Sequence, residues 1–421
     1  MTSDKDEGWP PGEPIRVRVE ILSWVNRFAG GPGTGEVTLT EEAKPGTTVR
    51  AVLRQVTDRY PPLAQALWDP GRSREIGDNI EVLVNNTVLG VSHDLDSELT
   101  DGDRITLLGQ YMGGAMELIR GIVAAPVTPM TTDFEVDWPG LRAYLGWLVP
   151  QRPTALALNM DAGEGPSLSP DERLRVIEEA RDAVAGACPV WSGLIAGSTR
   201  EATAHGRALA KAGAQGLVVF PPVPAFMGEP LPWPMPYEYH RAVGDATGLP
   251  LVLFQFPRGI GPSYSNETLC RLAEIPQVVA MKESTFDAPR LVETLAALRA
   301  APKPLAVLTG SDTFLCEAYV LGAHGALIGF GGIALAEQVK MFEVVQQHDY
   351  ATAFAIWGRL GPLARMMWGP PLRDYRPRMK EALVMLGVLR SAAVRPPMLP
   401  IGDAERRTIR RLLVEADLLG A

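Results

Sequence analysis

Cysteine and histidine are scarce in this sequence. Its 421 residues include 3 cysteines and 5 histidines, and neither type shows the short spacing typical of metal ligands. The odd number of cysteines (Cys188, Cys270 and Cys316) argues against a disulfide framework and is typical of buried thiols in a reducing compartment. We therefore expect a cytoplasmic protein with no metal site.

Long apolar runs and a strong charge are also lacking. No stretch has the length and purity of a membrane span, and residues 1–7 are polar and acidic with no apolar signal region behind them. The formal net charge of −9 is modest for this length and argues against a nucleic-acid surface. Hydrophobic residues, at 46%, are sufficient for the large cores of two domains. We expect neither a membrane nor a nucleic-acid partner.

The first quarter of the chain has an α+β pattern. Residues 1–14 are rich in proline, glycine and acidic side chains, which predicts a disordered tail. Alternating residues predict half-buried strands, Thr47 or Thr48 can cap a helix, and Asn85-Asn86 fits a hairpin turn. The expected elements are strands at residues 15–22, 80–84, 87–89 and 104–108 and a helix that begins near residue 47.

Three short motifs in this segment are Val84-Asn85-Asn86, residues 99–103 (Leu-Thr-Asp-Gly-Asp) and Gly113-Gly114. With the element order, they make residues 15–114 resemble the ubiquitin-like sulfur-carrier family of molybdopterin and thiamin biosynthesis. The resemblance implies a β-grasp domain whose terminal Gly-Gly is adenylated by a sulfur-activating enzyme and becomes a thiocarboxylate. In that family the second glycine ends the chain, whereas Ala115 follows here. Gly114 could therefore carry sulfur only after a protease cut.

The alternative interpretation of Gly113-Gly114 is a simple connection between two domains. Residues 115–120 would then be a linker, and Met116 would mark the start of a formerly separate gene. Both interpretations place a domain boundary here and a second domain at residues 121–421.

The second domain contains eight buried apolar runs separated by helix-like segments. They lie at residues 122–127, 155–159, 190–196, 216–220, 251–256, 278–281, 305–308 and 326–330. Eight buried strands with intervening helices predict an α/β fold, a parallel (β/α)8 TIM barrel. Further helices are expected at residues 350–368, 379–389 and 403–418. In such a barrel the catalytic residues lie at the carboxyl ends of the strands.

Lys282 ends the sixth of these runs, in Val278-Val279-Ala280-Met281-Lys282. Burial lowers the pKa of a lysine, and a neutral amine can attack a ketone to form a Schiff base. The other interpretation is a strand-end lysine whose amino group extends to water.

Several motifs bear on this choice. They are residues 121–129, Gly163-Glu164-Gly165, residues 278–284, residues 322–326 and Arg395-Pro396-Pro397. Residues 118–420 thereby resemble the dihydrodipicolinate synthase / N-acetylneuraminate lyase family. The members of that family are (β/α)8 barrels that act as class I aldolases and dehydratases. The resemblance implies that Lys282 condenses with pyruvate or another small 2-oxo acid. It implies no cofactor beyond the covalent lysine Schiff base, and a homo-oligomer, either a dimer or a tetramer.

The proton-moving residues of that family are replaced. Asp161 and Ala162 stand where the family has a Thr pair, and Phe254 and Val223 stand where it has two catalytic tyrosines. A phenylalanine cannot exchange a proton, so the usual acid/base is lost. Asp161 could shuttle protons, or could only pair with Lys282 as a buried ion pair.

The remaining candidates are residues near the strand ends. Asp312 could line the pocket or cap the next helix. Glycines after the eighth run leave room for a ligand or serve turns. The expected substrate-binding residues are Thr128, Ala162, Gly163, Phe254, Arg258, Ser311 and Gly329.

We therefore expect a Schiff-base lyase or synthase, of the aldolase or dehydratase type, with a substrate other than that of dihydrodipicolinate synthase. Two alternatives stay open. The first domain could deliver sulfur from Gly114, or the barrel could be a scaffold that has lost catalysis. The cost of burying a lysine without a role argues against the scaffold.

Overall fold

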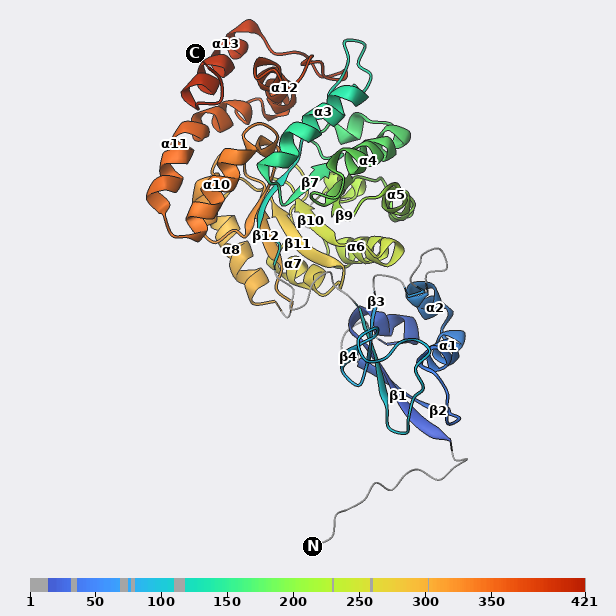
Figure 1. Ribbon diagram of the computed structural model, residues 1–421. Coiled ribbons are helices and arrows are strands. Elements are labelled where there is room, and N and C mark those ends of the chain that lie inside the picture. The colour runs from blue at the N-terminus through green and yellow to red at the C-terminus, as the bar shows by residue number, and fades with distance from the viewer. Residues whose placement is uncertain are drawn as a thin grey trace. The chain divides into compact units, whose positions relative to one another are not determined.

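The computed structural model describes residues 14–31, 36–68, 75–76, 80–109, 118–228, 231–257, 260–301 and 303–420. The expected tail, apart from Pro14, and Gly113, Gly114 and Arg258 lie outside these residues. The chain divides into two compact units, Met1–Glu117 and Leu118–Ala421, shown in Figure 1. In the described part of the chain, no helix combines the length and apolarity needed to cross a membrane.

The first unit is a five-stranded mixed sheet with helices. Its elements are β1 (Ile15–Leu22), η1 (Ser23–Ala29), β2 (Glu36–Ala43), α1 (Val49–Arg59), α2 (Pro61–Leu67), β3 (Ile80–Val84), β4 (Thr87–Val88) and β5 (Arg104–Gly109). The strand order is β2-β1-β5-β3-β4, with β1 parallel to β5 and the other pairs antiparallel. This is the α+β arrangement that the sequence predicts, with the β-grasp strand order that the resemblance implies.

Local sequence explains the start of α1 and the turn between β3 and β4. The Thr48 side chain accepts a hydrogen bond from the Ala51 amide and caps α1. Asn85 and Asn86 have φ values of 50° and 69°, as the tight turn between β3 and β4 requires. The sequence analysis missed β2, an edge strand with half of its residues exposed, which weakens its apolar signal.

The second unit is a closed barrel of eight parallel strands, and the predicted fold class is confirmed. The strands are β6 (Gly121–Ala124), β7 (Ala155–Leu158), β8 (Val190–Leu194), β9 (Gly216–Val219), β10 (Leu251–Gln255), β11 (Val278–Glu283), β12 (Ala306–Thr309) and β13 (Gly325–Ile328). Each overlaps one predicted apolar run. All residues of β7, β8, β9, β10, β12 and β13 are buried, which explains why the runs are apolar on both faces.

Helices surround the barrel. They are α3 (Trp138–Leu148), α4 (Pro170–Val184), α5 (Thr199–Ala212), α6 (Pro234–Thr247), α7 (Asn266–Ala273), α8 (Ala288–Arg299), α9 (Leu315–Val320) and α10 (Leu335–Gln346), followed by α11 (Tyr350–Met367), α12 (Tyr375–Met385) and α13 (Asp403–Glu415). The short helical turns are η2 (Val149–Gln151), η3 (Gly165–Ser167), η4 (Val223–Met227), η5 (Phe330–Gly332) and η6 (Leu372–Asp374).

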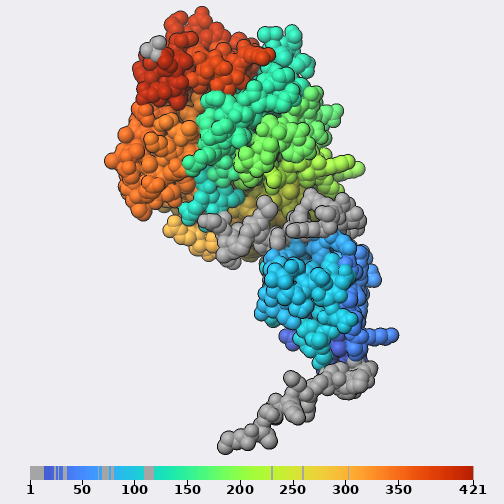
Figure 2. Space-filling view, in the orientation of Figure 1, coloured from blue at the N-terminus to red at the C-terminus, as the bar shows by residue number. Residues whose placement is uncertain are grey.

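The C-terminal helices are packed onto the barrel. Figure 2 shows the red C-terminal residues against the teal segment that begins the barrel. Arg395 connects the two, since its guanidinium donates to the Phe134 carbonyl and pairs with Glu172 of α4. The Arg395 hydrogen bond lowers the pKa of Glu172 to about 2, so this pair is ionised at neutral pH. The segment after α12 is thereby attached to the loop before α3 and to α4.

Candidate active site

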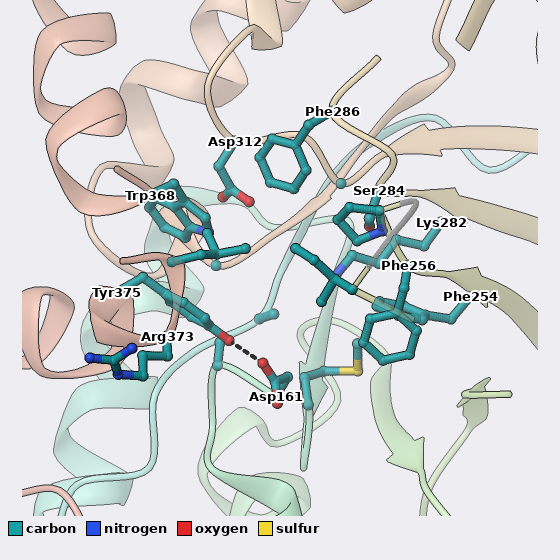
Figure 3. Close-up of a pocket in the computed structure, with 18 of the residues that line it drawn as sticks. Asp161, Phe254, Phe256, Lys282, Ser284, Phe286, Asp312, Trp368, Arg373 and Tyr375 are labelled. Atoms are coloured by element: carbon teal, nitrogen blue, oxygen red, sulfur yellow. Dashed lines mark hydrogen bonds between the residues drawn. The ribbon is translucent and has the colours of Figure 1, made fainter. Parts of the chain in front are cut away.

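A cavity of about 360 Å³ opens at the carboxyl ends of the barrel strands. Its polar lining comes from strand ends and from the C-terminal helices, and its remaining walls are largely aromatic (Figure 3). The polar lining residues are Asp161, Lys282, Ser284, Asp312, Arg373, Tyr375 and Arg376. This is the place where a TIM barrel carries its chemistry.

Lys282 is the penultimate residue of β11 and reaches the cavity. Burial lowers the pKa of its amine to about 8, and the charges of Asp312 and Asp161 offset part of that effect. The Lys282 Nζ lies 4.8 Å from the centroid of the Phe254 ring. At Gly310, a Cβ atom would lie 2.7 Å from the Lys282 Cε and 2.0 Å from the Ser284 hydroxyl. A side chain at this position, directly after β12, would therefore displace Lys282 or Ser284.

Asp312 lies in the same cavity, after β12. Its Oδ1 accepts a hydrogen bond of 2.8 Å from the Phe330 amide. Burial raises the pKa of the Asp312 carboxyl to about 7, against the opposing effects of that hydrogen bond and of Lys282. Helix α9 begins only at Leu315, after Phe314 at its N-cap, so Asp312 lines the pocket and does not cap the helix. A carboxyl group of this pKa can both give and take a proton near neutral pH.

Asp161 follows β7 and also reaches the cavity. Its Oδ2 accepts a hydrogen bond of 2.7 Å from the Tyr375 hydroxyl and is paired with Arg376. Burial, followed by the charge of Asp161, raises the pKa of Tyr375 well above its ordinary value. The structure thus gives the Asp161 carboxylate a tyrosine and an arginine as direct partners. Both partners belong to α12.

The other expected substrate-binding residues fall into two groups. Ala162, Phe254 and Gly329 line the cavity. Thr128, Gly163 and Ser311 are bonded within the loops beside it: the Thr128 hydroxyl donates to the Gly163 carbonyl at 2.7 Å, and the Ser311 hydroxyl accepts from the Phe286 amide at 3.1 Å.

The sequence analysis missed the contribution of the C-terminal helices. Trp368, at the end of α11, stacks on Tyr375 with ring centroids 5.4 Å apart and an interplanar angle of 18°. The strand pattern contains no signal for these residues. Among the described residues, no group of three or more His, Cys, Asp or Glu side chains could hold a metal ion.

A parallel eight-stranded barrel with a lysine of lowered pKa at its strand ends defines a class of protein, the class I aldolase type of lyase. Comparisons with known proteins then give the family. The model of the dihydrodipicolinate synthetase family matches residues 118–416, and the chain belongs to this family. Residues before 118 lie outside the match.

Relatives and solved structures agree with this assignment. The 4-hydroxy-tetrahydrodipicolinate synthase of Azoarcus sp. (strain BH72) is 30% identical over 289 residues, which are 68% of this chain and 94% of that protein. The chloride-inhibited dihydrodipicolinate synthase from Acinetobacter baumannii, complexed with pyruvate, is 29% identical with a TM-score of 0.65, covering 72% of this chain and all of that one (100%). YagE, a prophage protein of the same family from E. coli K12 in complex with pyruvate, is 25% identical with a TM-score of 0.66. The match covers 72% of this chain and 99% of that one. The barrel is thus a lyase of the class I aldolase type.

Proposed function

We propose that Lys282 forms a Schiff base with the 2-oxo group of a small 2-oxo acid, and that the barrel uses this imine for carbon–carbon or carbon–oxygen bond cleavage or formation. One observation carries the proposal. The Lys282 amine, with a pKa of about 8, faces a cavity that also holds two carboxyl groups. Two solved relatives are complexes with pyruvate, which supports this substrate class.

The residues present can move the protons that imine formation requires. The neutral Lys282 amine adds to the carbonyl carbon, and the carbonyl oxygen becomes a hydroxyl group. That hydroxyl leaves as water only when it receives a proton, and the nitrogen lone pair then forms the C=N bond. Asp312, with a pKa of about 7, can deliver the proton, and so can the Tyr375 hydroxyl that Asp161 holds. The resulting protonated imine accepts the electron pair of the bond that breaks next.

The replaced residues of the barrel support a substrate different from that of dihydrodipicolinate synthase. Asp161, Val223 and Phe254 replace the threonine and tyrosine residues that the resemblance leads one to expect. The pairing of the Asp161 carboxylate with Arg376 reduces its repulsion of a substrate carboxylate.

Borohydride trapping tests the proposal. The protein is incubated with each of a panel of 2-oxo acids, reduced with borohydride and weighed by mass spectrometry. We expect at least one acid to give the mass of its reduced adduct, Lys282→Ala to abolish that adduct, and Lys340→Ala to keep it, because Lys340 is exposed on α10. Absence of an adduct across the panel would refute the proposal.

A second candidate function concerns the first unit. Its β2-β1-β5-β3-β4 order supports the carrier hypothesis, in which Gly114 receives sulfur after cleavage. This function needs a protease and a sulfur-activating enzyme as partners. Intact-mass measurement of the protein from its native host tests it: a fragment that ends at Gly114 is expected, and a single uncleaved species would exclude the carrier.

A further inference from the structure

The cavity around Lys282 has two aromatic walls. On one side, Phe254 and Phe256 meet edge to face with ring centroids 4.6 Å apart, and Phe226 contacts Phe256 in the same way at 5.1 Å. On the other side Trp368 stacks on Tyr375. All five rings line the cavity. In Figure 3 the Phe254 and Phe256 rings lie across the cavity from Trp368 and Tyr375.

The phenylalanine wall begins at the reactive lysine and leads outward. Phe254 lies beside the Lys282 Nζ, whereas Phe226, the third ring of the row, is 45% exposed. A substituent on a substrate bound to Lys282 would therefore extend along Phe256 toward Phe226. Met160, Pro257 and Ile260 add to the apolar lining of the cavity.

The cavity is larger, and its apolar lining is more extensive, than a three-carbon acid requires. A cavity of about 360 Å³ is within the range of pockets that enclose whole organic ligands. Asp161 and Arg373 lie beside Tyr375, across the cavity from the phenylalanine rings (Figure 3), and those rings offer only apolar contacts and ring edges. Aromatic rings on two sides of a cavity favour an aromatic guest, because stacked and edge-to-face ring pairs gain stability beyond area burial.

We propose that the natural substrate is an aryl-substituted 2-oxo acid, whose ring lies between the Phe254–Phe256–Phe226 wall and the Trp368–Tyr375 wall. This inference rests on the proposed function, since Lys282 must first bind the 2-oxo group. In the imine, the bond from Nζ to C2 forms and the carbonyl oxygen leaves as water. The aromatic ring takes no part in that step and contributes binding alone.

Competitive trapping tests this inference. The protein receives equal concentrations of 2-oxobutanoate, 4-cyclohexyl-2-oxobutanoate and 4-phenyl-2-oxobutanoate with cyanoborohydride, and mass spectrometry measures each adduct at early times. Burial of the ring predicts that the phenyl acid labels about tenfold or more faster than 2-oxobutanoate. Ring–ring contacts predict about threefold over the cyclohexyl acid.

Two phenylalanine variants make the test specific. Phe256→Ala removes a ring from the wall and is expected to reduce the phenyl preference about threefold or more. Phe354→Ala, on the exposed surface of α11 and 48% exposed, is the matched control and should keep the preference.

The outcomes separate the two proposals. Equal labelling by the phenyl acid and 2-oxobutanoate would overturn the aromatic substrate and leave the Schiff base intact. A cyclohexyl acid that labels as fast as the phenyl acid would likewise overturn it, in favour of a merely apolar substrate. No labelling by any acid would refute the Schiff base itself, and the aromatic substrate with it.

Discussion

Lys282 and Asp312 influence each other's charge, because the carboxylate favours the ammonium form and the ammonium favours the carboxylate. The pKa of Lys282 is about 8, so the reactive neutral amine increases as pH rises through that value. Asp312→Asn removes a negative charge that raises the pKa of Lys282. We expect the inflection in the pH profile of cyanoborohydride labelling to move to lower pH in this variant.

The control for this prediction is Asp133→Asn, which changes an exposed loop residue and should leave the inflection in place. An unchanged inflection in Asp312→Asn, or one at higher pH, would show that Asp312 does not control the lysine.

Tyr375 offers a second residue-scale prediction. Its hydroxyl donates to Asp161 in the cavity and could deliver the proton that releases water during imine formation. Loss of a positioned acid typically costs two orders of magnitude or more, but Asp312 can substitute in part. We expect Tyr375→Phe to slow adduct formation with a saturating 2-oxo acid about 10- to 100-fold, as measured by quenched-flow mass spectrometry.

Tyr264→Phe is the matched control. Tyr264 is also buried, and in the described part of the chain its hydroxyl has no hydrogen-bond partner. This variant should label at the wild-type rate. A Tyr375→Phe variant that is equally fast would exclude Tyr375 from proton transfer.

At the scale of elements, a buried ion pair attaches α12 to the loop after β7. The Lys380 amine of α12 pairs with Glu164, and both side chains are fully buried at 0% exposure. Glu164 also accepts from the Arg395 amide at 2.9 Å. The pair therefore fixes the two segments that supply Asp161 and Tyr375 to the cavity.

Lys380→Met leaves the Glu164 carboxylate buried without its cation. We expect the free energy of unfolding of the barrel to fall by about 3–5 kcal/mol, as urea titration would measure. Adding Glu164→Leu should recover part of that loss, since the uncompensated charge is then gone. A double variant no more stable than Lys380→Met would contradict this account of the pair.

The elements also show what the sequence could and could not predict. The eight strands were predictable because fully buried parallel strands are continuous apolar runs. Helix α12 was expected to begin at residue 379, but it begins at Tyr375. Pro377 lies in the first turn of this helix, where a proline is tolerated because its missing N–H has no intrahelical partner. The four additional residues include Tyr375, which donates to Asp161 in the cavity.

At the scale of the whole molecule, the position of Lys282 at a strand end follows from the barrel's periodicity, but its partners do not. Asp161 and Tyr375 are 214 positions apart, and only the packing of α12 on the barrel brings them together. The identity of each residue was visible in the sequence. Their proximity was not, because it depends on contacts between distant segments.

The two units have separate hydrophobic cores. The cluster around Val17, Val52 and Leu107 contains only residues of the first unit, and the barrel cluster contains only residues of the second. We expect Leu118–Ala421, expressed alone, to fold and to form the Lys282 adduct. Calorimetry of the full chain should show two transitions, one of which the shortened chain reproduces. An unfolded barrel fragment would contradict this independence.

The central claim is that Lys282 is the nucleophile of this barrel. The most direct measurement is peptide mapping of the protein after borohydride reduction with the 2-oxo acid that labels best. We predict one modified peptide, with the added mass on Lys282 and none on Lys340 or Lys380. An adduct on another lysine, with Lys282 unmodified, would contradict the account.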